Sequence, residues 1–279
     1  MLVASVNKII NFSNVDGPHN RTSIFFQGCN LNCLFCHNPE TINFCLNCGD
    51  CVKTCPSKAL KISKGKVLWN PEICIDCDQC IKTCKHNSSP KILKLTVDDL
   101  IKRIKKTAPY IDGITVSGGE CTLHHEFLTA LFKEVKKLGL TCFVDSNGTL
   151  DFSKYPELLK YTDKVMLDVK AYDQQFHQWL VKYHNNQIIE NLSYLLSQDK
   201  LYEVRTIIFE GFDEANEYTV SKVASIIKDN CYYKLIKYRP FGVREENLKV
   251  IGENEVSDDY LQKYIDLAKK NGATKIIKV

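Results

Sequence analysis

Along most of the chain, short apolar runs alternate with longer stretches whose apolar residues recur at helical spacing. Thr96, with Asp99 three residues later, predicts a capping box that opens a helix. Gly139 ends a second amphipathic stretch, as glycine often does after a helix. The apolar runs predict strands over residues 24–26, 111–116, 140–144, 164–167, 201–209, 232–238 and 274–279. The amphipathic stretches predict helices over residues 96–108, 127–138, 154–161, 174–197, 217–228 and 256–270.

Strands that alternate with helices form a parallel sheet with the helices packed outside it. About six such units are predicted here, whereas eight close a full barrel. The expected fold class is therefore α/β, as a partial, TIM-like (β/α)6 barrel, with a doubly wound open sheet as the alternative. In both architectures ligands bind at the carboxyl ends of the strands, so side chains there are candidates for a functional site.

The composition argues against several classes of protein, namely nucleic-acid-binding, membrane-spanning and secreted proteins. The 279 residues are 44% hydrophobic, enough for one large α/β core and a small additional domain. The net charge is only +4, and the Lys-rich residues 102–106 alternate with apolar ones as on a solvated helix face, so nucleic-acid binding is not expected. No run of about 18 apolar residues occurs, and residues 1–10 do not resemble a signal peptide. We therefore expect a cytoplasmic protein without a membrane segment.

Cysteines dominate the candidate chemistry, because eleven of the fourteen lie between Cys29 and Cys84. Without a secretion signal, this number favours metal ligation in a reducing compartment over a disulfide framework. Cys142 and Cys231 fall in predicted strands and are expected to be core residues. Cys121 is interpreted as a packing residue, with a further redox ligand as the alternative.

Eight of these cysteines form an internal repeat with the spacing C-x2-C-x2-C-x3-C. The two runs are Cys45, Cys48, Cys51, Cys55 and Cys74, Cys77, Cys80, Cys84. In two-cluster ferredoxins the fourth cysteine of each run binds the other cluster. The spacing therefore predicts one 4Fe–4S cluster on Cys45, Cys48, Cys51 and Cys84, and another on Cys74, Cys77, Cys80 and Cys55. A pair of zinc sites is the alternative.

The repeat divides the chain. Residues 41–90 are expected to form an inserted ferredoxin-like domain with two 4Fe–4S clusters. Residues 1–40 and 91–279 would then form one discontinuous barrel domain. Pro56 follows the first cysteine run as in ferredoxins, whereas Lys85 follows the second, which changes the local turn but removes no ligand.

The remaining three clustered cysteines, Cys29, Cys33 and Cys36, have the spacing C-x3-C-x2-C. Three thiolates leave one of the four irons of a cubane without a protein ligand, which lets a small molecule reach it. A zinc site completed by His37 is the alternative. The spacing resembles that of the radical S-adenosylmethionine (SAM) enzymes.

Polar residues follow several predicted strands. Gly118 and Gly119 allow the backbone to approach a ligand closely, and the Glu120 carboxylate could hold an ammonium group. Asp145 and Asp168 end the next two strands, and these carboxylates need a counter-ion. A monovalent cation or a lysine could supply it. Each motif alone is also typical of a turn. Lys170 lies two residues after Asp168. Arg205 lies within the next predicted strand, where it could point into the barrel or form a core ion pair.

Together these motifs resemble the glycyl radical enzyme activating enzymes, a branch of the radical SAM superfamily, and most of all the YjjW-type activases with a double-ferredoxin insertion. The resemblance covers nearly the whole chain. The matching segments are residues 13–18, Arg21, residues 25–29, 36–41, 117–120, 145–148 and 168–170, and Arg205. His19 departs from the family, which usually has glycine there.

The resemblance implies roles for individual residues. Cys29, Cys33 and Cys36 would hold the cluster that cleaves SAM, beside the residues lining its adenine, which are Phe35, Cys36 and His37. Further SAM contacts would come from Gly118, Gly119, Glu120, Asp168, Val169, Lys170 and Arg205, and from Arg239, where many relatives have histidine. A monovalent cation would bind Asp145, Ser146, Asp168 and the Met166 carbonyl. The incoming partner peptide would contact Asp16 and Gly17.

The implied function is that of an anaerobic oxidoreductase. It would cleave SAM reductively to a 5′-deoxyadenosyl radical, which abstracts a glycine Cα hydrogen from a partner glycyl radical enzyme. The implied cofactors are three 4Fe–4S clusters and SAM as cosubstrate. A flavodoxin or a ferredoxin-type reductant would supply electrons. Two alternatives stay open: a radical SAM enzyme acting on a small molecule or another peptide, and a non-catalytic ferredoxin-like electron carrier.

Overall fold

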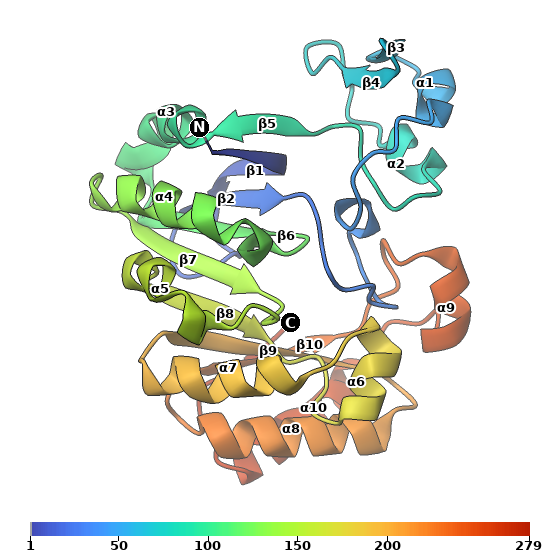
Figure 1. Ribbon diagram of the computed structural model, residues 1–279. Helices are drawn as coiled ribbons and strands as arrows, with labels where there is room; N and C mark the ends of the chain where they lie inside the picture. Colours follow the sequence, from blue (N-terminus) through green and yellow to red (C-terminus); the bar gives the residue numbers. More distant parts are fainter. Residues whose placement is uncertain (1) are drawn as a thin grey trace.

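The computed structural model describes residues 2–279, and nine strands join in one open, mostly parallel sheet (Figure 1). Its strand order is β11-β10-β9-β8-β7-β6-β2-β1-β5. The strands are β1 Val3–Ser13, β2 Arg21–Phe26, β5 Leu93–Thr96, β6 Gly113–Gly118, β7 Thr141–Ser146, β8 Lys164–Asp168, β9 Leu201–Ile208, β10 Tyr232–Lys237 and β11 Ile276–Lys278. The predicted α/β class with a parallel sheet is confirmed.

Parallel pairing joins β2 to β6 and then each strand to the next as far as β11. The order of the parallel strands never reverses, whereas the order in a doubly wound sheet does. Every predicted strand is present, but β1 and β5, which pair antiparallel at one edge, were not predicted. β1 is amphipathic only in part, with exposed apolar residues such as Phe12.

Alternate residues of the strands face different environments, as the two-residue period requires. Ile24 of β2 and Val116 of β6 face the helices and belong to one continuous apolar core. Their neighbours Ser23 and Thr115 point to the other side, where the buried Arg21 guanidinium donates to the Thr115 hydroxyl at 2.8 Å. The inner side of the sheet is therefore polar, although much of it is buried.

Helices cover the outer side of the sheet (Figure 1). They are α3 Val97–Thr107, α4 His125–Lys136, α5 Pro156–Tyr161, α7 Asn186–Ser197, α8 Asp213–Ile227 and α10 Asp258–Lys270. The helix α6, Gln174–Val181, instead packs in a second apolar cluster with the loop after β2. The capping box of α3 is confirmed, because Thr96 accepts from the Asp99 amide while Asp99 accepts from the Thr96 amide. The short helix α9, Glu245–Ile251, was not predicted.

Residues between the 3-10 turn η1, Pro39–Thr41, and β5 fold around a small apolar cluster of their own. They contain α1 Asp50–Thr54, the hairpin β3 Leu60–Ser63 with β4 Lys66–Trp69, and α2 Gln79–Thr83. The insertion is joined at its base, where Asn43 bridges to Ser88. Thr54 and Thr83 occupy the same position in the two cysteine runs, and their hydroxyls lie 3.1 Å apart. The sequence repeat is therefore also a structural repeat, with α1 packed against α2.

Within residues 2–279, none of the helices combines the length and the apolar character that crossing a membrane requires.

Thr96→Ala should lower the free energy of unfolding by about 1 kcal/mol, because it removes the hydroxyl that caps the first turn of α3. Urea unfolding of the two proteins measures the difference. Ser225→Ala is the matched control, since this exposed hydroxyl only donates to the Lys222 carbonyl inside α8. An equal effect of the two substitutions would contradict the capping role.

Candidate active site

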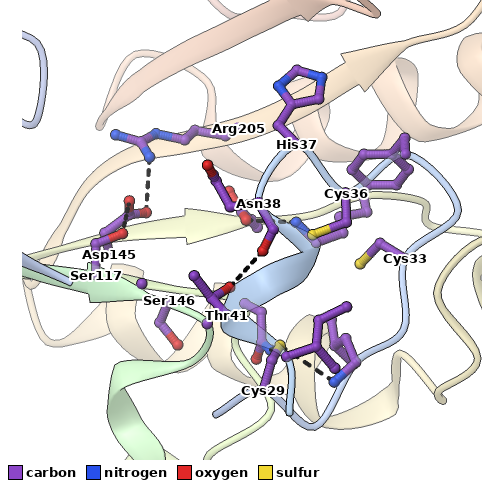
Figure 2. Close-up of a pocket in the computed structure, with 18 of the residues that line it drawn as sticks. Cys29, Cys33, Cys36, His37, Asn38, Thr41, Ser117, Asp145, Ser146 and Arg205 are labelled. Atoms are coloured by element: carbon purple, nitrogen blue, oxygen red, sulfur yellow. Dashed lines mark hydrogen bonds and ion pairs between the residues drawn. The ribbon is translucent and has the colours of Figure 1, made fainter. Parts of the chain in front are cut away.

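One cavity of about 310 Å³ lies where the parallel strands end (Figure 2). Its wall comes from the loop after β2 and from the next five strands in the sheet, β6 to β10. The predicted site residues among those lining it are Cys29, Cys33, Phe35, Cys36, His37, Gly118, Gly119, Asp145, Ser146, Asp168, Lys170 and Arg205. The fold thus brings together residues that are more than 170 positions apart in the sequence.

The three cysteines of the C-x3-C-x2-C run face this cavity (Figure 2). Burial raises the pKa of all three thiols, that of Cys29 to about 11, although the positive charge of Lys170 opposes the shift. The raised pKa values favour the protonated thiols. Metal binding requires the thiolate, so a bound cationic cofactor would favour the deprotonated form instead. Within residues 2–279, no group of three or more His, Cys, Asp or Glu side chains is arranged to hold a single metal ion.

Gly118 and Gly119 bring the end of β6 directly against the end of β2. A Cβ on Gly118 would lie 2.2 Å from the Phe26 amide nitrogen, and one on Gly119 would lie 2.3 Å from the Gly28 carbonyl oxygen. Neither approach is sterically allowed, so glycine is required at both positions. The two glycines leave this part of the cavity wall without side chains, so that a ligand could approach the backbone.

Glu120, the expected clamp for the amino group, is not among the residues that line the cavity, but it contacts two that are. Its buried carboxylate accepts hydrogen bonds from the Thr122 amide and hydroxyl, from the Ser146 hydroxyl at 2.9 Å and from the Asn147 amide at 2.6 Å. Burial raises the pKa of Glu120, but these hydrogen bonds favour the ionised form and oppose the shift. The geometry favours a positioning role, in which Glu120 holds Ser146 and Asn147 against the cavity.

A buried network of charges lies beneath the cavity. Arg205 donates to Asp145 at 2.8 Å and also to Glu203, which sequence reasoning missed. These carboxylates raise the pKa of Arg205, although burial opposes the shift. Lys234 lies 3.9 Å from Glu203. Arg205 therefore forms buried ion pairs and also lines the cavity, while its contact with a ligand stays a prediction.

A second ion pair lies on the other side of the cavity. The Lys170 ammonium is 2.6 Å from Asp168 and 5.4 Å from the centre of the Phe35 ring. Burial disfavours the charged ammonium, but the Asp168 carboxylate raises the pKa of Lys170 above its ordinary value. A permanent positive charge is thus held beside the three cysteines.

The family model of the radical SAM superfamily matches residues 23–218. A Haemophilus influenzae protein assigned to the glycyl-radical enzyme activating enzymes is 32% identical over 86% of this chain and 84% of its own. The chain belongs to the radical SAM superfamily, among the glycyl radical enzyme activating enzymes. The pyruvate formate-lyase-activating enzyme of Clostridium pasteurianum is 27% identical over 86% of this chain and 83% of its own. QueE from Escherichia coli, 14% identical, shares the fold with a TM-score of 0.55 over 99% of this chain and 94% of its own.

Some expected SAM contacts of this activating enzyme lie outside the cavity. Val169 is fully buried in the apolar core between sheet and helices, because it faces outward from the sheet. The Arg239 side chain pairs with Glu255 at 3.1 Å, and only the Arg239 carbonyl approaches the site, 2.9 Å from His37 Nε2. Side-chain contacts from Val169 and Arg239 to a ligand in this cavity are not supported.

The expected cation ligands and partner-peptide residues lie on the inner side of the sheet. Met166 pairs with Asp145 between β7 and β8, and its sulfur lies 3.1 Å from Arg205 Nη2. The Asp16 carboxylate accepts from the Ser13 and Ser23 hydroxyls at 2.6 and 2.7 Å. Gly17, next to Asp16, packs against Arg21. Asp16, Gly17 and Met166 do not line the cavity.

Two smaller cavities of the activating enzyme lie in the insertion. One is lined by Cys45, Cys48, Cys51 and Cys84, together with Cys80. The other is lined by Cys55, Cys74, Cys77 and Cys80. Each cavity thus gathers three cysteines of one run and the fourth cysteine of the other.

The structure also adds residues that sequence reasoning did not select. Asn147 lines the cavity, and its side-chain amide lies 3.9 Å from the Cys29 sulfur. Asn38 and Thr41, which are joined by a 2.8 Å hydrogen bond, line the wall next to His37. Asn147 and Asn38 both lie in motifs that matched the family. Each is next to a predicted site residue in the sequence, and this adjacency could have identified them.

Glu120→Gln should destabilise the protein by about 2 kcal/mol or more, because one amide group would face donors where two carboxylate oxygens now accept. Urea unfolding at pH 7 measures the loss. Glu126→Gln, at an exposed position of α4, is the control and should leave stability nearly unchanged. A fully stable Glu120→Gln protein would show that these hydrogen bonds do not hold the cavity wall.

Proposed function

We propose that this chain activates a glycyl radical enzyme by removing one hydrogen atom from a glycine Cα of that partner. The observation that carries the proposal is the single cavity lined by three cysteines, by a side-chain-free glycine pair and by two buried ion pairs. When bound, a 4Fe–4S cluster supplies one electron to SAM, which splits into methionine and a 5′-deoxyadenosyl radical. The names of the Haemophilus influenzae and Clostridium pasteurianum relatives support this reaction.

Cys29, Cys33 and Cys36 would hold this cluster, since their sulfur atoms face one space and no other cysteine lines it. The Gly118 and Gly119 backbone would accept the methionine amino group of SAM, because no side chain blocks it there. These residues would bind SAM and orient it within the cavity.

The remaining cavity residues would bind the rest of SAM. Phe35 and His37 offer a ring surface for the adenine, beside the Cys36 ligand. The Asp168–Lys170 pair and Arg205 present fixed charges to the polar groups of the methionine. Asp145 and Asp168 already have cationic partners in Arg205 and Lys170, which removes the charge argument for a monovalent cation at Asp145, Ser146, Asp168 and the Met166 carbonyl.

The insertion, residues 41–90, would be a ferredoxin-like domain within a radical SAM domain of residues 1–40 and 91–279. Its two cysteine-lined cavities support two further 4Fe–4S clusters, three in all. These clusters would relay electrons from a flavodoxin or a ferredoxin-type reductant. Reduced clusters of this kind require anaerobic conditions, and fourteen free cysteines suit the reducing cytoplasm.

The partner would be a glycyl radical enzyme whose glycine loop enters the cavity. Asp16 and Gly17 would lie close to this loop, on the inner side of the sheet. The Thr115 hydroxyl donates to the Asp16 carbonyl at 2.6 Å, and the Ser13 and Ser23 hydroxyls donate to its carboxylate. This segment is therefore held in a fixed conformation before any peptide arrives.

Anaerobic reconstitution should load about twelve irons per chain, four for each of three cubane clusters. Cys33→Ala should retain about eight irons and form no 5′-deoxyadenosine with dithionite and SAM, because it removes one ligand of the cavity cluster. Cys231→Ala, in the core, is the control and should keep the full iron content and activity. Product formation by the Cys33→Ala protein would refute the cluster assignment, and about four irons in the wild type would refute the two inserted clusters.

Incubation with SAM, a reductant and the correct glycyl radical enzyme should produce a glycyl radical on that partner, detected by electron paramagnetic resonance. The Cys33→Ala activase should produce none, because no electron reaches SAM. A partner whose radical-bearing glycine is replaced by alanine is the control for the position of the radical. Consumption of SAM with a small molecule as hydrogen donor, and no radical on any such partner, would favour the alternative radical SAM function.

A further inference from the structure

The loop that carries Cys29, Cys33 and Cys36 has little regular secondary structure of its own and is held from both sides by other elements. On one side it meets the end of α6. There the Asn32 amide donates to the Val181 carbonyl at 3.1 Å, and the Leu34 amide donates to the Leu180 carbonyl at 2.9 Å. These two bonds fix the middle of the loop against one helix.

The other side of the loop meets α9, the helix that was not predicted. Arg244, the residue just before α9, donates from Nη2 to the Asn32 side-chain carbonyl at 2.8 Å and to the Cys33 backbone carbonyl at 3.4 Å. Asn247, in the first turn of α9, donates from its side chain to the Leu34 carbonyl at 2.8 Å. Two side chains from more than 200 positions later in the sequence therefore bind three consecutive residues of the loop.

Arg244 also places a positive charge close to the cysteines. Its side chain is only 14% exposed, and Glu246, which lies 4.0 Å away, is 71% exposed and pairs with it weakly. Within residues 2–279, the buried Arg244 Nε has no hydrogen-bond partner. A guanidinium whose charge is not cancelled by a buried carboxylate is thus held against the backbone of Cys33.

We propose that Arg244 and Asn247 are positioning residues that hold the cysteine loop in its ligand-bearing conformation, and that the Arg244 charge raises the reduction potential of the cluster bound there. The potential of an iron–sulfur cluster depends on nearby charge, hydrogen bonding and exposure. A positive charge near the cluster favours the reduced form, which carries one more electron. Only the statement about potential rests on the proposed function.

Hydrogen exchange of the full-length, cluster-free chain tests the positioning role. Arg244→Gln and Asn247→Ala should each raise the exchange rate of residues 29–36 roughly tenfold, the effect of losing one charge-assisted or buried hydrogen bond. Lys249→Gln, at an exposed position of α9, should leave it unchanged. If Arg244→Gln also raises the exchange rate in β9, global destabilisation explains the effect of that variant. The exchange rate of residues 29–36 in Asn247→Ala then decides whether α9 positions the loop. Unchanged exchange of residues 29–36 in Asn247→Ala and Arg244→Gln would overturn the positioning role.

Redox titration of the reconstituted enzyme, followed by electron paramagnetic resonance of the cavity cluster, tests the charge effect. Arg244→Gln should shift the midpoint potential of this cluster to more negative values, and Arg244→Lys should keep it close to the wild type because the charge remains. Lys249→Gln should not shift it. Equal potentials of Arg244→Gln and wild type would overturn the charge effect. Failure of the wild type to bind a cluster at Cys29, Cys33 and Cys36 would instead refute the proposed function, and the exchange result would stand independently.

Discussion

The close contact between the ends of β2 and β6 is the constraint on which the site depends. The Gly119 amide donates to the Phe26 carbonyl at 2.9 Å, and the Glu120 amide donates to the Gly28 carbonyl at 2.8 Å. Because side chains are sterically excluded at Gly118 and Gly119, the two backbones meet directly. The next residue after Gly28 is the first cysteine, so this contact places the whole cysteine loop over the carboxyl end of the sheet.

Buried ion pairs are the second feature of the site. Asp145, Asp168 and Glu203 are buried or half-buried, and Arg205 and Lys170 are paired with them. Buried carboxylates without such partners would become protonated rather than remain charged. The network therefore keeps fixed, partly buried charges at the cavity wall, where they act more strongly on a polar ligand than they would in bulk water. Such fixed charges suit a cavity that binds a polar or charged ligand.

The insertion is an internal repeat with a small apolar cluster of its own. Two equivalent segments pack with α1 against α2, and the equivalent residues Thr54 and Thr83 meet. Its apolar cluster is small and includes cysteines, so metal binding would contribute much of its stability. The insertion is therefore a small unit with its own apolar cluster and not an extension of the main core.

The sequence alone determined the strands and helices of the parallel sheet, because their period-2 and period-3.6 patterns are local and the βα order is sequential. It also showed the three cysteine runs, since their spacing is encoded within a few residues. Only the tertiary structure decided that the Glu120 carboxylate bonds to Ser146 and Asn147, that Arg205 pairs with Asp145, and that α9 holds the cysteine loop. Such contacts join residues far apart in the chain, and each depends on which side chain faces inward after folding, so no local pattern encodes them.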